Sequence, residues 1–133
     1  MTPMPDAAPL PRVLFVEDED VLVSAYRRFF AARYTMAFAT TGEQAVPQME
    51  AFAPDLLVLD MNLPDTDGVD VLRRLRALRP ALPVVVTTAY ASMEPLLGVM
   101  GLGHNGFLTK PFELGDLGKT IDGVLKAVSG GPA

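Results

Sequence analysis

The chain has 133 residues and a mass of 14.3 kDa, which is enough for one domain with a single hydrophobic core. Its net charge of −5 argues against direct nucleic-acid binding, which usually requires a basic face. The absence of cysteine excludes disulfides and thiolate metal sites and is compatible with a cytoplasmic protein, and the single histidine, His104, excludes a histidine-based metal cluster.

The two ends of the chain differ in composition from its body. Residues 1–11 contain four prolines, which predicts a disordered leader, and they lack the basic start and long apolar centre of a secretory signal. Residues 129–133, SGGPA, are typical of a tail or a truncated linker. No apolar run reaches the ~18 residues of a membrane span. One non-membrane domain is therefore predicted over residues 12–128.

Short apolar runs alternate along the body with longer segments in which apolar residues have helical spacing. The predicted strands cover residues 13–16, 34–39, 56–59, 84–88 and 106–109. The predicted helices cover residues 20–32, 42–52, 69–78, 92–102 and 114–128. In the first of these helices the residues at helical spacing are Val21, Leu22, Ala25, Phe29 and Ala32.

Particular residues are expected to shape the predicted helices. Thr41 should cap the second helix, and Pro47 should bend or shorten it. Pro95 should interrupt the fourth helix near its start. Five glycines in the last two helices predict that this end of the molecule is locally soft, because each glycine costs ~1 kcal/mol in a helix interior.

The alternation of strands and helices predicts the α/β class. Continuous valine and leucine runs are typical of parallel strands that are buried on both faces. Five strands, each followed by a helix, therefore predict a three-layer (βα)5 fold with a doubly wound parallel sheet. In such sheets ligands bind beyond the carboxyl ends of the strands, where the strand order switches.

Polar side chains stand at or just beyond the ends of four predicted strands. They are Glu17, Asp18, Asp60, Thr87, Thr88 and Lys110. Clustered carboxylates raise one another's pKa values unless a cation joins them, and one lysine cannot balance three acids. Mg²⁺ is the expected cation, and a threonine hydroxyl and an ammonium group suit phosphoryl oxygens. The pattern predicts phosphoryl transfer, with Thr88 facing the site and Thr87 packed into the sheet.

Four motifs occur in this order along the chain and are highly specific together: VLFVEDED, LLVLDMNLPDTDG, VVVTTAYA and GFLTKPF. They resemble the receiver (REC, chemotaxis-Y-like) domain of two-component response regulators, and the match covers residues 12–128 without a gap. The resemblance implies a flavodoxin-like fold with the strand order 2-1-3-4-5.

The resemblance also implies a role for each matching position. Asp60 is the implied phosphoacceptor, with Thr88 hydrogen-bonding the incoming phosphoryl group and Lys110 pairing with it. The implied ligands of Mg²⁺ are Glu17, Asp18, Asp60 and the backbone carbonyl of Asn62. Thr88 and Phe107 are the implied switch residues, and the bond between Lys110 and Pro111 is expected to be cis.

Some residues depart from the family pattern or have plainer interpretations. Glu17 stands where aspartate is more familiar, and Phe107 lacks the hydroxyl of a tyrosine. Asp65 and Asp67 are expected to shape a turn and cap a helix rather than bind metal. The residues expected on solvated surfaces without a role are Arg27, Arg28, Arg73, Arg74, Arg76 and His104.

The implied function is a phosphorylation-controlled switch. A partner sensor histidine kinase or phosphotransfer protein phosphorylates Asp60 in a Mg²⁺-dependent reaction, and the face made by the fourth helix, fifth strand and fifth helix rearranges. The implied output is an unknown protein or a missing effector domain, without direct nucleic-acid or membrane binding and with room for a weak homodimer. The chain would catalyse only its own phosphorylation and dephosphorylation and is not expected to be an enzyme otherwise.

Three other function classes fit parts of the sequence. A Mg²⁺-dependent aspartyl-phosphate phosphatase of the haloacid-dehalogenase type needs a second acid two residues after its nucleophile, where this chain has Asn62. A phosphorylation-independent scaffold has no reason to keep the complete set of strand-end residues. A flavodoxin-like cofactor carrier is disfavoured because acids follow the first strand in place of a phosphate-binding Gly/Ser/Thr loop.

Overall fold

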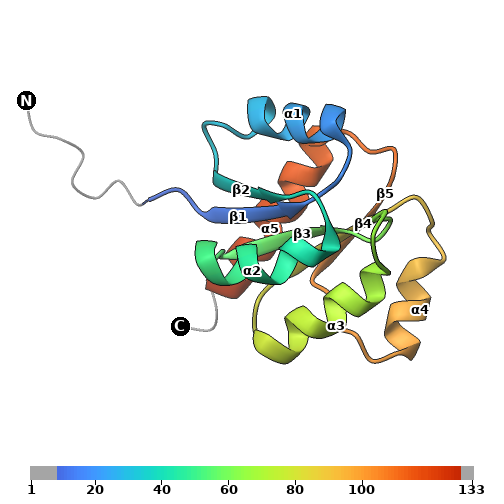
Figure 1. Ribbon diagram of the computed structural model, residues 1–133. Coiled ribbons are helices and arrows are strands. Elements are labelled where there is room, and N and C mark those ends of the chain that lie inside the picture. The colour runs from blue at the N-terminus through green and yellow to red at the C-terminus, as the bar shows by residue number, and fades with distance from the viewer. Residues whose placement is uncertain (1–8, 130–133) are drawn as a thin grey trace, which may run out of the picture.

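The computed structural model describes residues 9–129 and consists of a five-stranded sheet between two layers of helices (Figure 1). The strands are β1 (Arg12–Val16), β2 (Thr35–Ala39), β3 (Leu56–Asp60), β4 (Val84–Thr88) and β5 (Gly106–Thr109). Their order is β2-β1-β3-β4-β5, and every neighbouring pair is parallel. The predicted α/β class, layer arrangement and strand order are confirmed.

Five helices connect or follow the strands. They are α1 (Asp20–Phe29), α2 (Gly42–Phe52), α3 (Gly68–Leu78), α4 (Met93–Val99) and α5 (Leu114–Ser129). Helices α1 and α5 cover one face of the sheet, and α2, α3 and α4 cover the other (Figure 1). Across residues 9–129, no helix is both long and apolar enough to cross a membrane. Residues 1–8 of the predicted leader and 130–133 of the predicted tail lie outside the described residues.

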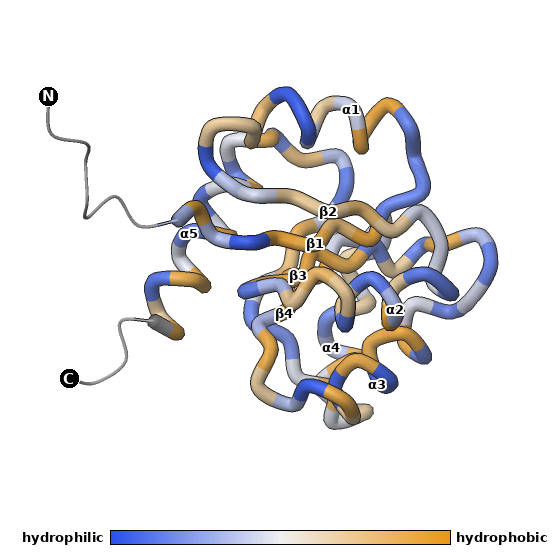
Figure 2. Tube along the Cα trace, turned by 60° about the vertical axis from the view of Figure 1, so that its left-hand side comes forward, coloured by the Kyte–Doolittle hydropathy of each residue, from blue (hydrophilic) through white to orange (hydrophobic). Residues whose placement is uncertain are grey.

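Each face of the sheet has its own hydrophobic cluster, because successive strand residues point to opposite sides. Leu57 and Val86 pack with α2, α3 and α4. Their neighbours Val58 and Val85 pack with α1 and α5. Hydrophobic residues accordingly run through the central strands of the molecule (Figure 2). Because β3 and β4 are buried along their whole length, they form a rigid support for the residues at their ends.

Helix α1 differs from its prediction in its end and in its buried face. It ends at Phe29 rather than at residue 32, because Phe30 leaves helical geometry and its buried ring packs into the core. Val21 and Phe29, which have the predicted helical spacing, are 85% and 44% exposed. The buried residues of this helix are Val23 and Tyr26.

Helices α2 and α4 accommodate their prolines in different ways. Thr41 caps α2 as predicted, and Pro47 lies inside this helix without shortening it. Helix α4 ends at Val99 rather than at residue 102, because the chain turns at Gly101, whose φ of +71° lies in the left-handed region. Pro95 lies in the first turn of α4, where the missing N–H has no partner to lose.

The two aspartates of the loop after β3 fix the starts of two helices. Asp67 is the predicted cap of α3, and its Oδ1 accepts a hydrogen bond from Val69 N–H at 3.0 Å. Asp65 instead caps α2, because its carboxylate accepts from the backbone N–H groups of Gly42 (2.8 Å) and Glu43 (3.0 Å). The second half of the loop that follows Asp60 is therefore anchored to the first turns of both α2 and α3.

Arg76 is not the solvated arginine that the sequence predicts. Its guanidinium donates hydrogen bonds to the backbone carbonyls of Leu82 and Gly103, the second at 2.9 Å, and to the side chain of Asn105 at 3.2 Å. The prediction is wrong because the long side chain turns back from the helix surface to backbone carbonyls of two loops. Arg76 thereby links the end of α3 to the segments that enter β4 and β5.

Candidate functional site

The ends of β1, β3 and β4 bring four polar side chains to one edge of the sheet. Glu17 follows β1, Asp60 ends β3, and Thr87 and Thr88 end β4. Asp60 and Thr87 are paired in register. Alternation directs both to the face covered by α1 and α5, whereas Thr88 faces α3 and α4. All four residues are at most 2% exposed.

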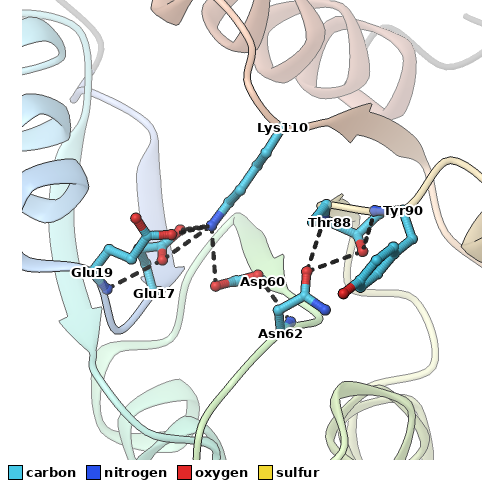
Figure 3. Close-up of polar contacts among 8 residues, drawn as sticks. Glu17, Glu19, Asp60, Asn62, Thr88, Tyr90 and Lys110 are labelled. Atoms are coloured by element: carbon cyan, nitrogen blue, oxygen red, sulfur yellow. Dashed lines mark hydrogen bonds and ion pairs between the residues drawn. The ribbon is translucent and has the colours of Figure 1, made fainter.

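Lys110 joins three carboxylates at this edge (Figure 3). Its Nζ lies 3.1 Å from Glu17 Oε1, 3.1 Å from Glu19 Oε1 and 3.2 Å from Asp60 Oδ2. The predicted cis bond between Lys110 and Pro111 is present. One oxygen from each of the three acids lies within 4.8 Å of the others, which is a spacing suited to a shared metal ion.

Burial and crowding of charge change the protonation of this cluster. Burial and the charge of Asp60 raise the pKa of Glu17 to about 7, against the opposing effect of Lys110. Burial also raises the pKa of Asp18, and Asp60 adds to the shift. Burial acts to lower the pKa of Lys110, but the carboxylates of Glu17 and Asp60 outweigh it and raise this pKa. Lys110 is therefore charged at neutral pH, whereas Glu17 exchanges its proton in the neutral range.

Asn62 connects Asp60 to Thr88. The backbone N–H of Asn62 donates a hydrogen bond to Asp60 Oδ1 at 2.9 Å. Its side-chain Oδ1 accepts hydrogen bonds from Thr88 Oγ1 (3.2 Å) and from the backbone N–H of Ala89 (2.9 Å). Thr88 Oγ1 accepts in turn from Tyr90 N–H at 3.2 Å (Figure 3). From the sequence, Asn62 has a role only through its backbone carbonyl, as an implied metal ligand. The bridge that its side chain forms to Thr88 is an addition from the structure.

Phe107 packs against the hydrophobic cluster on the same side of the sheet as Thr88. The centroid of its ring lies 5.8 Å from that of His104. His104 Nε2 lies 3.0 Å from Glu94 Oε2 in the first turn of α4, and only 16% of the His104 side chain is exposed. His104 lies in the loop before β5 as predicted, but its side chain is mostly covered, and it connects α4 to this loop.

Comparisons with known proteins decide the family of this chain. The family model described as "Response regulator receiver domain" matches residues 13–122. The chain belongs to the response regulator receiver domain family. It is 36% identical over 117 residues to the transcriptional regulatory protein PrrA of Mycobacterium tuberculosis, covering 87% of this chain and 50% of PrrA. It is 31% identical over 115 residues to the regulatory protein LuxO of Vibrio vulnificus, covering 86% of this chain and 25% of LuxO.

Solved receiver domains share the fold. The CheY-like receiver domain protein from Methanospirillum hungatei JF-1 has a TM-score of 0.83 at 25% identity, covering 91% of this chain and 98% of that structure. The signal receiver domain of a putative LuxO repressor protein from Vibrio parahaemolyticus has a TM-score of 0.81 at 30% identity, covering 90% and 93%. The chain thus matches whole receiver domains but spans half or less of the curated relatives named above.

The acidic cluster of this receiver domain contains Glu19 in addition to two of the predicted metal ligands. Glu17, Glu19 and Asp60 form the close group, and Asp18 lies outside it. Asp18 is half-buried and near enough for the charge of Asp60 to raise its pKa. One signal in the sequence could have pointed to Glu19, which stands two residues after Glu17 in the acidic run EDED.

The donor set of the receiver domain fits a hard divalent cation. Carboxylate oxygens are the ligands that such cations prefer. Oε1 of Glu17 is buried and accepts no hydrogen bond within the described residues, although Lys110 Nζ lies 3.1 Å away. Lys110 is one cation for three carboxylates, and a divalent cation bound beside Oε1 would add to the charge that neutralises them.

Mg²⁺ affinity of the receiver domain is expected to fall at low pH. A cation that binds Glu17 must displace the proton that this carboxyl holds below a pKa of about 7. From about pH 8 to about pH 6 we expect a roughly tenfold loss of Mg²⁺ affinity in calorimetric titrations. Equal affinity at both pH values would contradict the expectation, and Glu17→Gln should remove the pH dependence.

The same pKa shift has the opposite consequence for the metal-free fold. The folded-state pKa of Glu17 is raised from 4.5 to about 7, so the folded state binds the proton more tightly than the unfolded state. Its contribution to stability is complete below 4.5 and is lost as the pH rises through about 7. Urea denaturation of the metal-free protein across this window measures the effect.

Proposed function

We propose that this receiver domain, with limits at residues 12–128, is a cytoplasmic phosphoacceptor of two-component signal transduction. A partner histidine kinase or phosphotransfer protein phosphorylates it on Asp60. The observation that carries the proposal is the Asp60 carboxylate, which ends β3, is 1% exposed and lies 3.2 Å from Lys110 Nζ. A carboxylate held by a buried strand beside an ammonium group is a positioned nucleophile with a counterion for its product.

The reaction transfers one phosphoryl group to Asp60. An oxygen of its carboxylate attacks the phosphorus of a phosphohistidine on the partner. The new P–O bond forms as the P–N bond breaks, and the electron pair of the broken bond stays on the imidazole nitrogen. Lys110 pairs with the oxygens of the transferred group, and the Thr88 hydroxyl donates a hydrogen bond to one of them. The chain acts only on itself, in this transfer and in the later hydrolysis of its acyl phosphate.

Mg²⁺ is the cofactor proposed for the transfer. Its proposed ligands are Glu17, Asp18, Asp60 and the backbone carbonyl of Asn62, with Glu19 as an additional carboxylate. When bound, the cation would neutralise charge on the transferring phosphoryl oxygens. The clustering of three acids within 4.8 Å and the burial of Glu17, which is 2% exposed, support this assignment.

Access for the phosphodonor is supported by a cavity of about 440 Å³ next to Lys110. The cavity is lined by Glu19, Leu22, Ala89, Lys110, Pro111 and Phe112. Its lining comes from α1, the segment after β4 and the segment after β5, so it lies beside the acidic cluster at the same edge of the sheet. A phosphohistidine side chain entering here would meet Lys110, the residue that contacts Asp60.

The output of the switch is proposed to be the face formed by α4, β5 and α5. Thr88 is hydrogen-bonded to Asn62, so a phosphoryl group on Asp60 competes with this amide for the Thr88 hydroxyl. Phe107 packs on the same side of the sheet and fills the space when Thr88 moves. The ring of His104 and its contact with Glu94 carry the change to α4. An output protein or an effector domain then reads the altered face.

Beryllofluoride, a stable mimic of the phosphoryl group, tests this function. With Mg²⁺ and beryllofluoride, we expect backbone amide signals of α4, β5 and α5 to shift more than those of α2 in nuclear magnetic resonance spectra. The reason is that the proposed movement of Thr88 and Phe107 links Asp60 to that face, whereas α2 contacts only the second half of the loop after Asp60, through Asp65. Asp60→Asn is the matched control and should show no shifts. Shifts confined to the residues around Asp60 would contradict the switch.

A further inference from the structure

Two buried hydroxyl groups, those of Tyr26 and Thr87, lie beneath the acidic site, and phosphoryl transfer as described does not use them. Tyr26 of α1 is fully buried, and its hydroxyl has no hydrogen-bond partner within the described residues. The same is true of Thr87 Oγ1 and of Glu17 Oε1. Among residues 9–129, four buried side-chain polar atoms lack a hydrogen-bond partner, and three of the four are these two hydroxyls and Glu17 Oε1.

The sheet places these three groups on one face. Glu17 follows Phe15 by two residues, so both side chains point toward α1. The ring of Tyr26 stacks on Phe15, with centroids 4.7 Å apart. Thr87 points to the same face from β4, beside Asp60. The Tyr26 ring therefore lies along β1, under the position that Glu17 occupies.

Electrostatics support the direction of the Tyr26 hydroxyl. Burial raises its pKa most, and the charges of Glu17, Asp60 and Glu19 raise it further. A phenol beside a buried carboxylate is a suitable donor, and a hydrogen bond to an ionised acceptor is among the stronger ones in proteins.

We infer that Tyr26 is a positioning residue for Glu17. Its hydroxyl donates a hydrogen bond to one buried water that Thr87 and the Glu17 carboxylate also bind, and so fixes the direction in which Oε1 would face a bound cation. A buried water commonly makes such bonds to two to four polar groups. The consequence for Mg²⁺ rests on the proposed function, whereas the hydrogen bond itself does not.

The test compares Tyr26→Phe with Tyr34→Phe. Tyr34 belongs to the same hydrophobic cluster, but its hydroxyl donates a hydrogen bond to Asp122 Oδ1 at 2.6 Å. Asp122 lies in α5 and is not part of the acidic cluster at the strand ends. Tyr26→Phe is expected to weaken Mg²⁺ binding about tenfold at constant pH, because partners that orient metal ligands have effects of this size. Tyr34→Phe is expected to leave Mg²⁺ affinity unchanged. Calorimetric titration of each folded variant measures both.

A double-mutant cycle in the metal-free protein tests whether Tyr26 and Glu17 interact, independently of Mg²⁺ binding. Tyr26→Phe and Glu17→Met are expected to be non-additive in urea denaturation, since Phe lacks the donor hydroxyl and Met lacks the acceptor oxygens of the same interaction. Additive effects would overturn the inference, and so would an unchanged Mg²⁺ affinity in Tyr26→Phe when the wild type binds Mg²⁺. If the wild type fails to bind Mg²⁺, the proposed function is wrong, and the cycle alone supports or overturns the hydrogen bond.

Discussion

Replacing Lys110 by alanine is expected to slow phosphorylation of Asp60 about 100-fold, the size of effect seen when one group that stabilises transition-state charge is removed. Lys110 is the cation that contacts Asp60 in the described part of the chain, and its raised pKa keeps it charged. Without it, the oxygens of the transferring phosphoryl group lose their counter-charge from the protein. The rate of modification by acetyl phosphate at saturating Mg²⁺, followed by intact mass, measures the loss.

Mg²⁺ binding should respond to the same substitution in the opposite direction. The Lys110 ammonium neutralises Glu17, Glu19 and Asp60 in the metal-free protein, so it competes with a bound cation. Lys110→Ala is therefore expected to bind Mg²⁺ at least as tightly as the wild type in calorimetric titrations. Lys110→Arg keeps the charge with a different geometry and should give an intermediate phosphorylation rate. A wild-type rate in Lys110→Ala would refute the role of the ammonium.

Gly68→Ala is expected to destabilise the fold by about 2–3 kcal/mol, in the range of an overpacked core. A Cβ at position 68 would lie 2.5 Å from Met61 Cα and 2.7 Å from Met61 O. These are backbone atoms of the residue after Asp60, so neither can move away without shifting β3 or the start of α3. The midpoint of urea denaturation reports the change, and a smaller phosphorylation rate should accompany it.

The control for this prediction is Gly98→Ala in α4. A Cβ at Gly98 would meet nothing within 4 Å, so only the helix propensity changes. Alanine there is expected to stabilise the protein by up to about 1 kcal/mol. Equal stability of Gly68→Ala and the wild type would show that the segment between Asp60 and α3 is more adaptable than its packing indicates.

The fold could be predicted from the sequence because hydrophobic runs, glycines and prolines set the elements locally. The apolar run before Asp60 predicts β3 and places this carboxylate at its end, and the structure extends the strand by one residue to include Asp60. The face of α1 that is buried against the sheet could not be predicted in the same way. Val21 has the right spacing but is 85% exposed, because packing on Phe15 selects Tyr26 for the core instead.

The residues of the site that the sequence missed are those whose roles depend on side-chain direction. Strand ends predict that Glu17, Asp60 and Lys110 meet, since parallel strands bring their carboxyl ends to one edge. Nothing in the spacing says that the side chain of Asn62 would bridge to Thr88. That contact depends on how the loop after β3 folds back over β4, which is decided by tertiary packing.

The most direct test of the account is the mass of the protein after incubation with acetyl phosphate and Mg²⁺. The wild type is expected to gain one phosphoryl group, and Asp60→Asn none. Asp65→Asn and Asp67→Asn are matched controls in the same loop, and because both aspartates serve as helix caps, each variant is expected to be modified like the wild type. Modification of Asp60→Asn to the same extent as the wild type would contradict the assignment of Asp60 as the phosphoacceptor.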